Sequence, residues 1–246
     1  MPVFFVPPQC VSHQEISVTS DVLTHLRDSL RVKVGEIILL SDGVGRRYRT
    51  QVKEVSKQDL TGRIIETITQ PAPSAPALTL GQALLKGEKM DWVIQKATEL
   101  GVSEIVPIAS RHSVVQLKAD RVDHQLARWR RIALEAAQQS EQWRIPTITP
   151  PQSLASLLTS RGNGTMTLIL TERQSGINLQ AVDLPKDHTH LVLVLIGPEG
   201  GWSHEEMQTV NQPGTVSATL GQQILRAETA AIAAISILQS RLGQLG

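Results

Sequence analysis

Short apolar runs alternate with amphipathic segments along most of the chain, and this alternation predicts a succession of strands and helices. The clearest run is Leu191–Ile196, six aliphatic residues with no polar interruption. It is too short for a buried helix and is typical of a strand covered on both faces of a parallel sheet. Similar patterns predict strands at 78–85, 102–108, 166–170 and 216–220, and helices at 91–100, 122–139, 153–158 and from about 230 to 242. Strands that alternate with helices predict an α/β domain with a mainly parallel sheet.

The first 70 residues have a different pattern, with short β-like runs and one helical insertion. Ser20 or Asp21 is placed to start a helix in which Leu23, Leu26 and Leu30 share one face. Strands are expected at 36–40, 48–55 and 62–68. Residues 70–77, QPAPSAPA, contain three prolines among small residues and are the clearest linker in the chain. We therefore expect a β-rich domain at 1–70, a linker at 71–77 and an α/β domain at 78–246.

A glycine-rich loop, GPEGG at 197–201, follows the strand at 191–196. Ser203 then precedes acidic residues at 205 and 206, which is the pattern of an N-cap with a negatively charged first helical turn. Strand, glycine loop and helix is the layout in which α/β proteins bind ligands at the carboxyl end of a strand. The spacing matches neither a dinucleotide fingerprint nor a P-loop. Taken alone, the loop is equally compatible with a tight turn that binds nothing.

Composition narrows the classes of function. The 246 residues carry a net charge of only +1, so a nucleic-acid surface requires local clusters of basic residues. One such cluster, Arg46, Arg47 and Arg49, flanks Tyr48, although a charged, solvated hairpin edge is the favoured explanation of this cluster taken alone. The single cysteine offers neither an internal disulfide nor a metal-binding cluster. No apolar run is long enough to span a bilayer and no secretory pattern opens the chain, so we expect a cytoplasmic protein.

Two motifs together carry a resemblance to a known family. GPEGGWS at 197–203 is followed by LGQQILRAETA at 220–230. This pair resembles the signature of the SPOUT-class RNA methyltransferases, and more narrowly of the ribosomal RNA small subunit methyltransferase E family, which methylates N3 of a uridine in 16S ribosomal RNA. Supporting segments are HLRDSLRVKVGEIILLSDG at 25–43, KGEKMDWVIQKATELGV at 86–102 and RWRRIALEAAQQSEQWRIP at 128–146. The resemblance covers most of the chain, in order. Departures from the family pattern fall at Val3, Gln223 and 140–144.

The resemblance implies a fold and a cofactor. The first domain would be a PUA-like β-barrel that binds RNA. The second would be a SPOUT domain with a trefoil knot at roughly 168–246, and the protein would be a homodimer. S-adenosylmethionine would bind among three loops, and no metal would be needed. The implied cofactor-binding residues are Leu170, Thr171, Glu172, Ile196, Gly197, Pro198, Glu199, Gly200, Gly201, Leu220, Gly221, Ile224, Leu225, Arg226, Thr229 and Ala230.

The same resemblance implies roles in chemistry and RNA binding. Arg226 would stabilise negative charge that develops on the uracil ring, and Glu228 would orient it or the cofactor. Because N3 lies on the Watson–Crick edge, the target uridine must be unpaired or flipped out. His112 is expected to be structural. Phosphate contacts are expected from Arg27, Arg31, Arg46, Arg47, Arg49, Lys86, Lys89, Lys96, Arg111 and Arg144.

Two other readings of the sequence remain open at this point. A different SPOUT enzyme, acting on another ribosomal or transfer RNA nucleotide, would use the same cofactor motifs. A non-catalytic RNA-binding or assembly factor would keep the fold without the reaction, although the intact glycine loop and ILRAETA segment argue against it.

Overall fold

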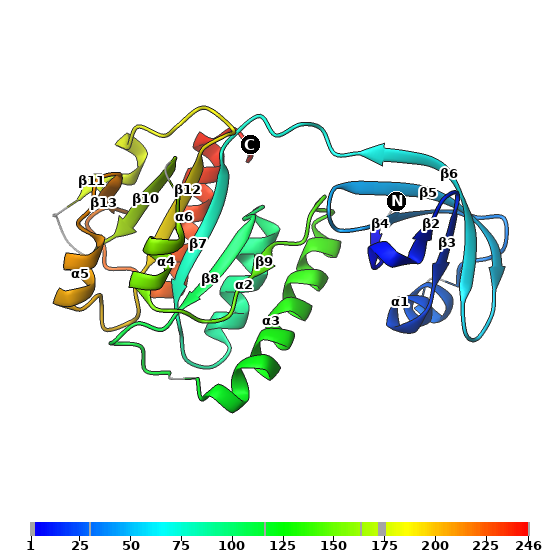
Figure 1. Ribbon diagram of the computed structural model, residues 1–246, viewed down its shortest axis with the longest axis horizontal. Coiled ribbons are helices and arrows are strands. Elements are labelled where there is room, and N and C mark those ends of the chain that lie inside the picture. The colour runs from blue at the N-terminus through cyan, green and yellow to red at the C-terminus, as the bar shows by residue number, and fades with distance from the viewer. Residues whose placement is uncertain (1–2, 30, 116, 163, 172–175, 246) are drawn as a thin grey trace. The chain divides into compact units, whose positions relative to one another are not determined.

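A computed structural model describes residues 3–29, 31–115, 117–162, 164–171 and 176–245. The chain divides into two compact units (Figure 1). The first consists of Met1–Ala72 together with Leu134–Ile145, and the second of Pro73–Ala133 together with Pro146–Gly246. Residues 134–145 therefore pack with the first unit although they lie far from it in the sequence.

The second unit is built on a parallel sheet. Its described strands form a seven-stranded sheet in the order β11-β13-β10-β12-β7-β8-β9, and every pair in it is parallel. This confirms the predicted α/β class. The strands are β7 (Ala77–Ala83), β8 (Glu104–Ile108), β9 (Thr147–Ile148), β10 (Thr165–Leu170), β11 (Ile177–Asn178), β12 (Leu191–Ile196) and β13 (Thr215–Thr219). The short edge strands β9 and β11 were not predicted, because two residues give no hydrophobic period.

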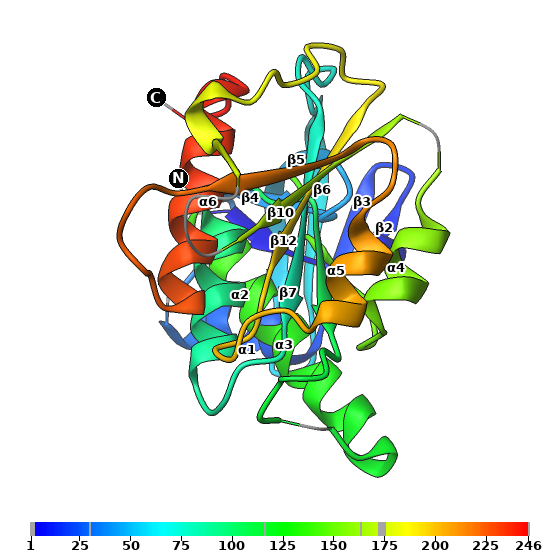
Figure 2. The same cartoon turned by 90° about the vertical axis from the view of Figure 1, so that its left-hand side faces the viewer.

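Helices cover both faces of this sheet. Helices α2 and α6 lie on one face, and α4 and α5 on the other, as two perpendicular views show (Figures 1 and 2). The apolar run of β12 is buried along both faces, as its pattern predicts: Val192 and Val194 on one side and Leu193 and Leu195 on the other are fully inaccessible to solvent. The helices are α2 (Lys89–Glu99), α3 (Ala119–Gln139), α4 (Leu154–Ser160), α5 (His204–Val210) and α6 (Ala227–Arg241).

Local signals explain where these helices begin and end. Ser203 caps α5 through a complete capping box: its hydroxyl accepts from the N–H of Glu206, and the Glu206 carboxylate accepts from the N–H of Ser203. After α2, Gly101 adopts φ +77°, a left-handed conformation typical of the residue that follows a helix. Among the described helices, none is both long and apolar enough to cross a membrane.

The first unit contains a six-stranded sheet in the order β1-β4-β5-β6-β3-β2. Strands β1 and β4 pair in parallel and the other neighbours are antiparallel. The strands are β1 (Val3–Phe5), β2 (Val11–Ser12), β3 (Glu15–Val18), β4 (Ile37–Ser41), β5 (Arg46–Val55) and β6 (Leu60–Thr69), with helix α1 (Ser20–Thr24) running into a π-helical turn at His25–Ser29. The predicted strands and helix are all present, whereas β1, β2 and β3, which have four residues or fewer, were not predicted.

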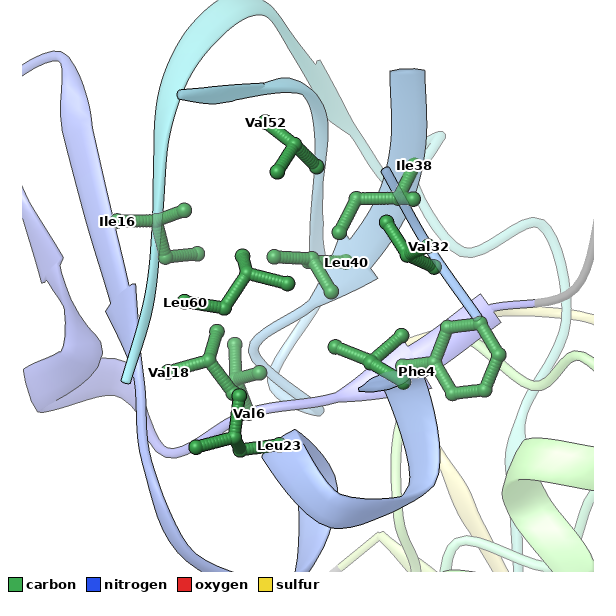
Figure 3. Packing of buried hydrophobic residues seen from close by; sticks show 11 residues of the cluster. Phe4, Val6, Ile16, Val18, Leu23, Val32, Ile38, Leu40, Val52 and Leu60 are labelled. Atoms are coloured by element: carbon green, nitrogen blue, oxygen red, sulfur yellow. The ribbon is translucent and has the colours of Figure 1, made fainter. Parts of the chain in front are cut away.

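A compact apolar core fills this unit. Phe4 and Leu40 from the sheet pack with Leu23 from α1 and with Leu60 from β6 (Figure 3). Leu26 is fully buried beside them, whereas Leu30, the third predicted leucine, lies outside the described residues. The helix is thus held by its apolar face against the sheet, as its spacing predicts.

Candidate functional site

Three segments that follow neighbouring parallel strands meet at the carboxyl edge of the second sheet. They follow β10, β12 and β13, which lie side by side in the sheet. Together they enclose a cavity of about 520 Å³. Its lining is Leu170, Thr171, Ile196, Gly197, Pro198, Glu199, Gly201, Trp202, Met207, Thr219, Leu220, Gly221, Gln223, Ile224, Leu225, Arg226, Ala227 and Ala230. Ligand pockets of proteins have volumes of roughly 300–1,000 Å³ and occur at this edge of parallel sheets.

Most of the residues predicted to bind a cofactor line this cavity. The exceptions among described residues are Gly200 and Thr229, which are not part of the lining. Glu172 lies outside the described residues. The segments at 170–171, 196–201 and 220–230 are therefore brought together as one site, which is what the family resemblance implies.

Five lining residues were not predicted: Trp202, Met207, Thr219, Gln223 and Ala227. Trp202 directly follows the glycine loop, and Met207 lies one turn into α5. The position of Trp202 within the GPEGGWS motif was the available signal. The direction in which Met207 points could be known only after α5 had been placed against the sheet.

Backbone geometry explains two of the loop glycines. Gly201 has φ +71°, a conformation that side chains rarely adopt. A Cβ atom on Gly197 would lie 3.1 Å from Nε1 of Trp202, so the indole packs directly on bare backbone. The loop is also held from outside, because Nδ1 of His112 lies 3.1 Å from the carbonyl oxygen of Gly201. His112 thus has a structural contact to the loop, as expected.

Two buried polar atoms in the cavity wall have no hydrogen-bond partner among the residues that the structure describes. They are Oγ1 of Thr171 and Nε1 of Trp202. Buried polar groups in native proteins are almost always paired. Both atoms are therefore polar groups of the cavity wall whose hydrogen-bonding capacity the described residues do not use.

The two residues predicted to act in catalysis have different surroundings. Arg226 lines the cavity with an exposed side chain and is the N-cap residue of α6, but its side chain makes no capping bond. Glu228, in the first turn of α6, is not part of the lining and is only 15% exposed. Its Oε1 lies 3.5 Å from Nζ of Lys89, which also forms an ion pair with Glu199.

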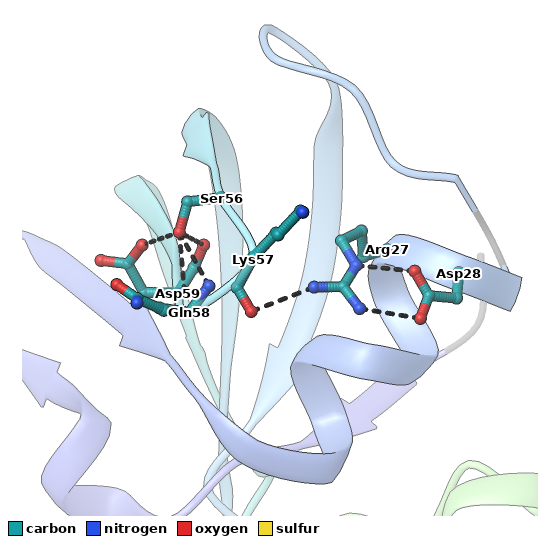
Figure 4. A network of polar contacts seen from close by, with 6 residues as sticks. All are labelled: Arg27, Asp28, Ser56, Lys57, Gln58 and Asp59. Carbon is teal, nitrogen blue, oxygen red and sulfur yellow. Dashed lines mark hydrogen bonds and ion pairs between the residues drawn. The ribbon is translucent and has the colours of Figure 1, made fainter.

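In the first unit, several residues predicted to contact RNA have partners within the protein. Arg27 pairs with Asp28 and donates to the carbonyl oxygen of Lys57, beside a turn closed by Ser56 (Figure 4). The partners of the others are Glu66 for Arg49, the carbonyl oxygen of Glu141 for Arg47, and Oε1 of Gln70 for Arg144. Arg31 and Arg46 have exposed side chains.

In the second unit, too, some of the predicted RNA-binding cations are paired with carboxylates and others are exposed. Lys96 pairs with Glu99, and Arg111 pairs with Glu205 at 2.5 Å. Lys89 is engaged by the two carboxylates described above, whereas Lys86 is exposed and has no ion pair with any described residue. Arg31, Arg46 and Lys86 are therefore the predicted cations whose charge is most accessible to a partner.

Comparisons with known proteins agree with this geometry. The family described as RNA methyltransferase domain matches residues 72–239, and the RNA methyltransferase PUA domain matches residues 18–65. The ribosomal RNA small subunit methyltransferase E of Mycobacterium bovis is 31% identical over 231 residues, covering 91% of this chain and 87% of that protein. The protein of the same name from Bacillus subtilis is 28% identical over 228 residues, covering 90% and 88%.

Solved structures agree as well. The crystal structure of a ribosomal RNA small subunit methyltransferase E from Neisseria gonorrhoeae, bound to S-adenosyl methionine, has a TM-score of 0.86 and 31% identity, with 98% of each chain covered. A putative methyltransferase from Legionella pneumophila, in complex with the same cofactor, has a TM-score of 0.85 and 28% identity, with 97% of each chain covered. The methyltransferase-domain family matches most of the chain, and the relatives described above are similar over nearly all of it. The chain therefore belongs to the ribosomal RNA small subunit methyltransferase E family.

Proposed function

We propose that this protein transfers a methyl group from S-adenosylmethionine to N3 of a uridine in small-subunit ribosomal RNA. The observation that carries the proposal is the cavity at the carboxyl edge of the sheet, formed by the three segments that the family motifs occupy. The Neisseria gonorrhoeae relative, similar over nearly the whole chain, was solved with S-adenosyl methionine bound.

The cavity suits this cofactor chemically. Leu170, Ile196 and Leu225 give it apolar walls, against which an adenine ring can pack. Gly197 and Gly201 expose backbone groups, and the unpaired Oγ1 of Thr171 and Nε1 of Trp202 are free to bond to a ligand's polar atoms. We propose that the lining residues, together with the predicted Glu172, Gly200 and Thr229, form the binding site.

The residues of this chain position the reactants and stabilise the charge that develops during the reaction. When bound, S-adenosylmethionine supplies an electrophilic methyl group on a sulfonium centre. The exposed guanidinium of Arg226, at the mouth of the cavity, is placed to stabilise negative charge that develops on the uracil ring as N3 loses its proton. Glu228 does not reach the cavity wall, so we assign it a positioning role through its ion pair instead.

RNA binding would use the accessible cations first. We propose that Arg31, Arg46 and Lys86 contact phosphates, because their charges are exposed. Arg49, Lys96 and Arg111 form exposed or half-exposed ion pairs that contribute little stability, so RNA phosphates can displace those carboxylates at small cost. Arg27, Arg47 and Arg144 already donate to fixed oxygens in the first unit.

We further propose the finer features that the family implies: domains at 1–70 and 78–246, a PUA-like barrel, a trefoil knot at roughly 168–246, a homodimer and a cytoplasmic location. The end of α6 supports the knot, since Arg241 donates to the carbonyl oxygens of Leu179 and Val182 in the segment between β10 and β12. A partly exposed stripe on α6, containing Ile232 and Ile237, supports a dimer.

The test is methyl transfer from labelled S-adenosylmethionine to small ribosomal subunits that lack the modification, with naked ribosomal RNA in parallel. Label in 3-methyluridine is the expected result, and Arg226→Ala, assayed at saturating S-adenosylmethionine, is expected to lower the rate constant about a hundredfold. Label in another nucleoside would favour a different RNA methyltransferase of this class. Absence of cofactor binding would overturn the proposal and favour a non-catalytic RNA-binding factor.

A further inference from the structure

One ammonium group joins two of the segments that form the cavity. Lys89, the first residue of α2, forms an ion pair with Glu199 of the glycine loop and lies 3.5 Å from Oε1 of Glu228 in the first turn of α6. The hydrogen bond to Glu199 raises the pKa of Lys89, and the charge of Glu228 adds to this effect. The lysine therefore stays charged at neutral pH and is held in place by both carboxylates.

Both carboxylates belong to segments that shape the site. Glu199 lines the cavity itself. Glu228 stands between Ala227 and Ala230, which also line it. Lys89 therefore ties together two segments of the cavity wall, although its own side chain is not part of the lining.

Without Lys89, the negative charges of Glu199 and Glu228 would lose the cation that neutralises them. Both lie within ion-pair distance of one nitrogen atom, so they are close to each other and would repel. Oε2 of Glu228 is buried and has no hydrogen-bond partner among the described residues. The negative charge of this carboxylate is therefore compensated through Oε1, by its ion pair with Lys89. A largely buried carboxylate that loses its cation is costly, and local rearrangement is the usual relief.

Lys89 was predicted from the sequence as an RNA phosphate contact, and the geometry points to a different role. We propose that Lys89 is a positioning residue that fixes the 197–201 loop against the N-terminus of α6 so that the cavity is formed for S-adenosylmethionine. This role rests on the proposed function. Nearby Lys86, which is exposed and unpaired among the described residues, is the phosphate contact of this segment.

The two lysines provide a matched pair of variants, Lys89→Met and Lys86→Met. Cofactor affinity is measured by calorimetry with S-adenosylmethionine and with S-adenosylhomocysteine, which lacks the transferable methyl group and the sulfonium charge. RNA affinity is measured at several salt concentrations with a fragment of small-subunit ribosomal RNA. Thermal unfolding of each variant shows that it remains folded.

Lys89→Met is expected to weaken both cofactor forms alike, by about threefold to tenfold, the scale of two partly exposed ion pairs. It should leave the salt dependence of RNA binding unchanged. Lys86→Met should leave both cofactor affinities unchanged and reduce the slope of log affinity against log salt by about one. In Lys89→Met/Glu228→Gln, which leaves the cavity lining intact, the loss of cofactor affinity should be no greater than in Lys89→Met alone, because the like-charge repulsion is removed.

Three results would overturn the positioning role. Unchanged cofactor affinity in Lys89→Met would show that the ion pairs do not shape the cavity. A reduced salt slope for that variant would make Lys89 a phosphate contact. Tighter binding of S-adenosylmethionine alone would show that the lysine acts only by its charge. Failure of the wild-type protein to bind either cofactor form would instead refute the proposed function on which the inference rests.

Discussion

The guanidinium of Arg47 lies 3.9 Å from the centroid of the Trp143 ring. The same side chain donates a 2.5 Å hydrogen bond to the carbonyl oxygen of Glu141. Burial lowers the pKa of Arg47, against the opposing charge of Glu141. Arg47 thus attaches residues 141–143 to strand β5 within the first unit. Its predicted RNA contact remains a prediction, but the side chain also has a structural role that the exposed Arg49 of the same cluster lacks.

Arg47→Met is expected to lower the free energy of unfolding by about 1–2 kcal/mol, because it removes a stacked cation and a charged hydrogen bond. Urea denaturation of the 246-residue chain measures this change. Arg49→Met is the matched control, since Arg49 makes an exposed ion pair with Glu66 and should change stability by less than about 0.5 kcal/mol. Equal losses in the two variants would contradict the structural role of Arg47.

Gly197→Ala is expected to weaken binding of S-adenosylmethionine about tenfold. The new Cβ would lie 3.1 Å from Nε1 of Trp202, closer than such contacts normally are, so the indole would have to move within the cavity wall. Calorimetric titration with the cofactor measures the effect. Gly162→Ala serves as control, because a Cβ there meets open space. If the two variants bound the cofactor equally well, close packing at Gly197 would not matter for binding.

Arg241→Ala is expected to destabilise the protein by about 1–3 kcal/mol. Its guanidinium donates to the carbonyl oxygens of Leu179 at 2.8 Å and of Val182 at 2.5 Å, and both of these residues are buried. Loss of the donor leaves two carbonyl groups without this partner at the end of α6. The measurement is urea denaturation, with exposed Arg121→Ala as the control of equal residue type. A stability equal to that control would show that the contact does not fasten the C-terminal helix.

Glu206→Gln is expected to lower the free energy of unfolding by an amount that depends on pH. Burial raises the pKa of Glu206, but hydrogen bonds from the backbone N–H groups of Ser203 and Arg111 to its carboxylate lower the pKa overall. A carboxyl group whose pKa is lower in the folded state stabilises the protein above its unfolded pKa, roughly pH 4 to 5, and this contribution disappears as pH falls through the folded pKa.

The difference in unfolding free energy between wild type and Glu206→Gln should therefore be largest at pH 6–7 and shrink below about pH 4. Urea denaturation across this range measures it. Ser203→Ala, which removes the hydroxyl of the capping box, should reduce the same pH dependence. A difference that stays constant from pH 7 to pH 3 would rule out an ionised Glu206 as its source.

The sequence alone determined the elements whose signals are local. Six uninterrupted aliphatic residues determined β12, because only a strand covered on both faces buries all of them. Ser203 determined the start of α5, because a capping hydroxyl and its acidic partner lie within one turn. The motif pair indicated the family by resemblance, and that resemblance implied most of the residues that line the cavity.

Only the tertiary structure decided which distant residues meet. Lys89 and Arg47 were indistinguishable from RNA-binding cations in the sequence, and their carboxylate, carbonyl and indole partners lie about one hundred residues away or more. Residues 134–145 join the first unit through packing that no local pattern encodes. Hydrophobic periodicity reports which face of an element is buried, whereas the partner of a charged side chain is fixed only when the sheet brings separate segments together.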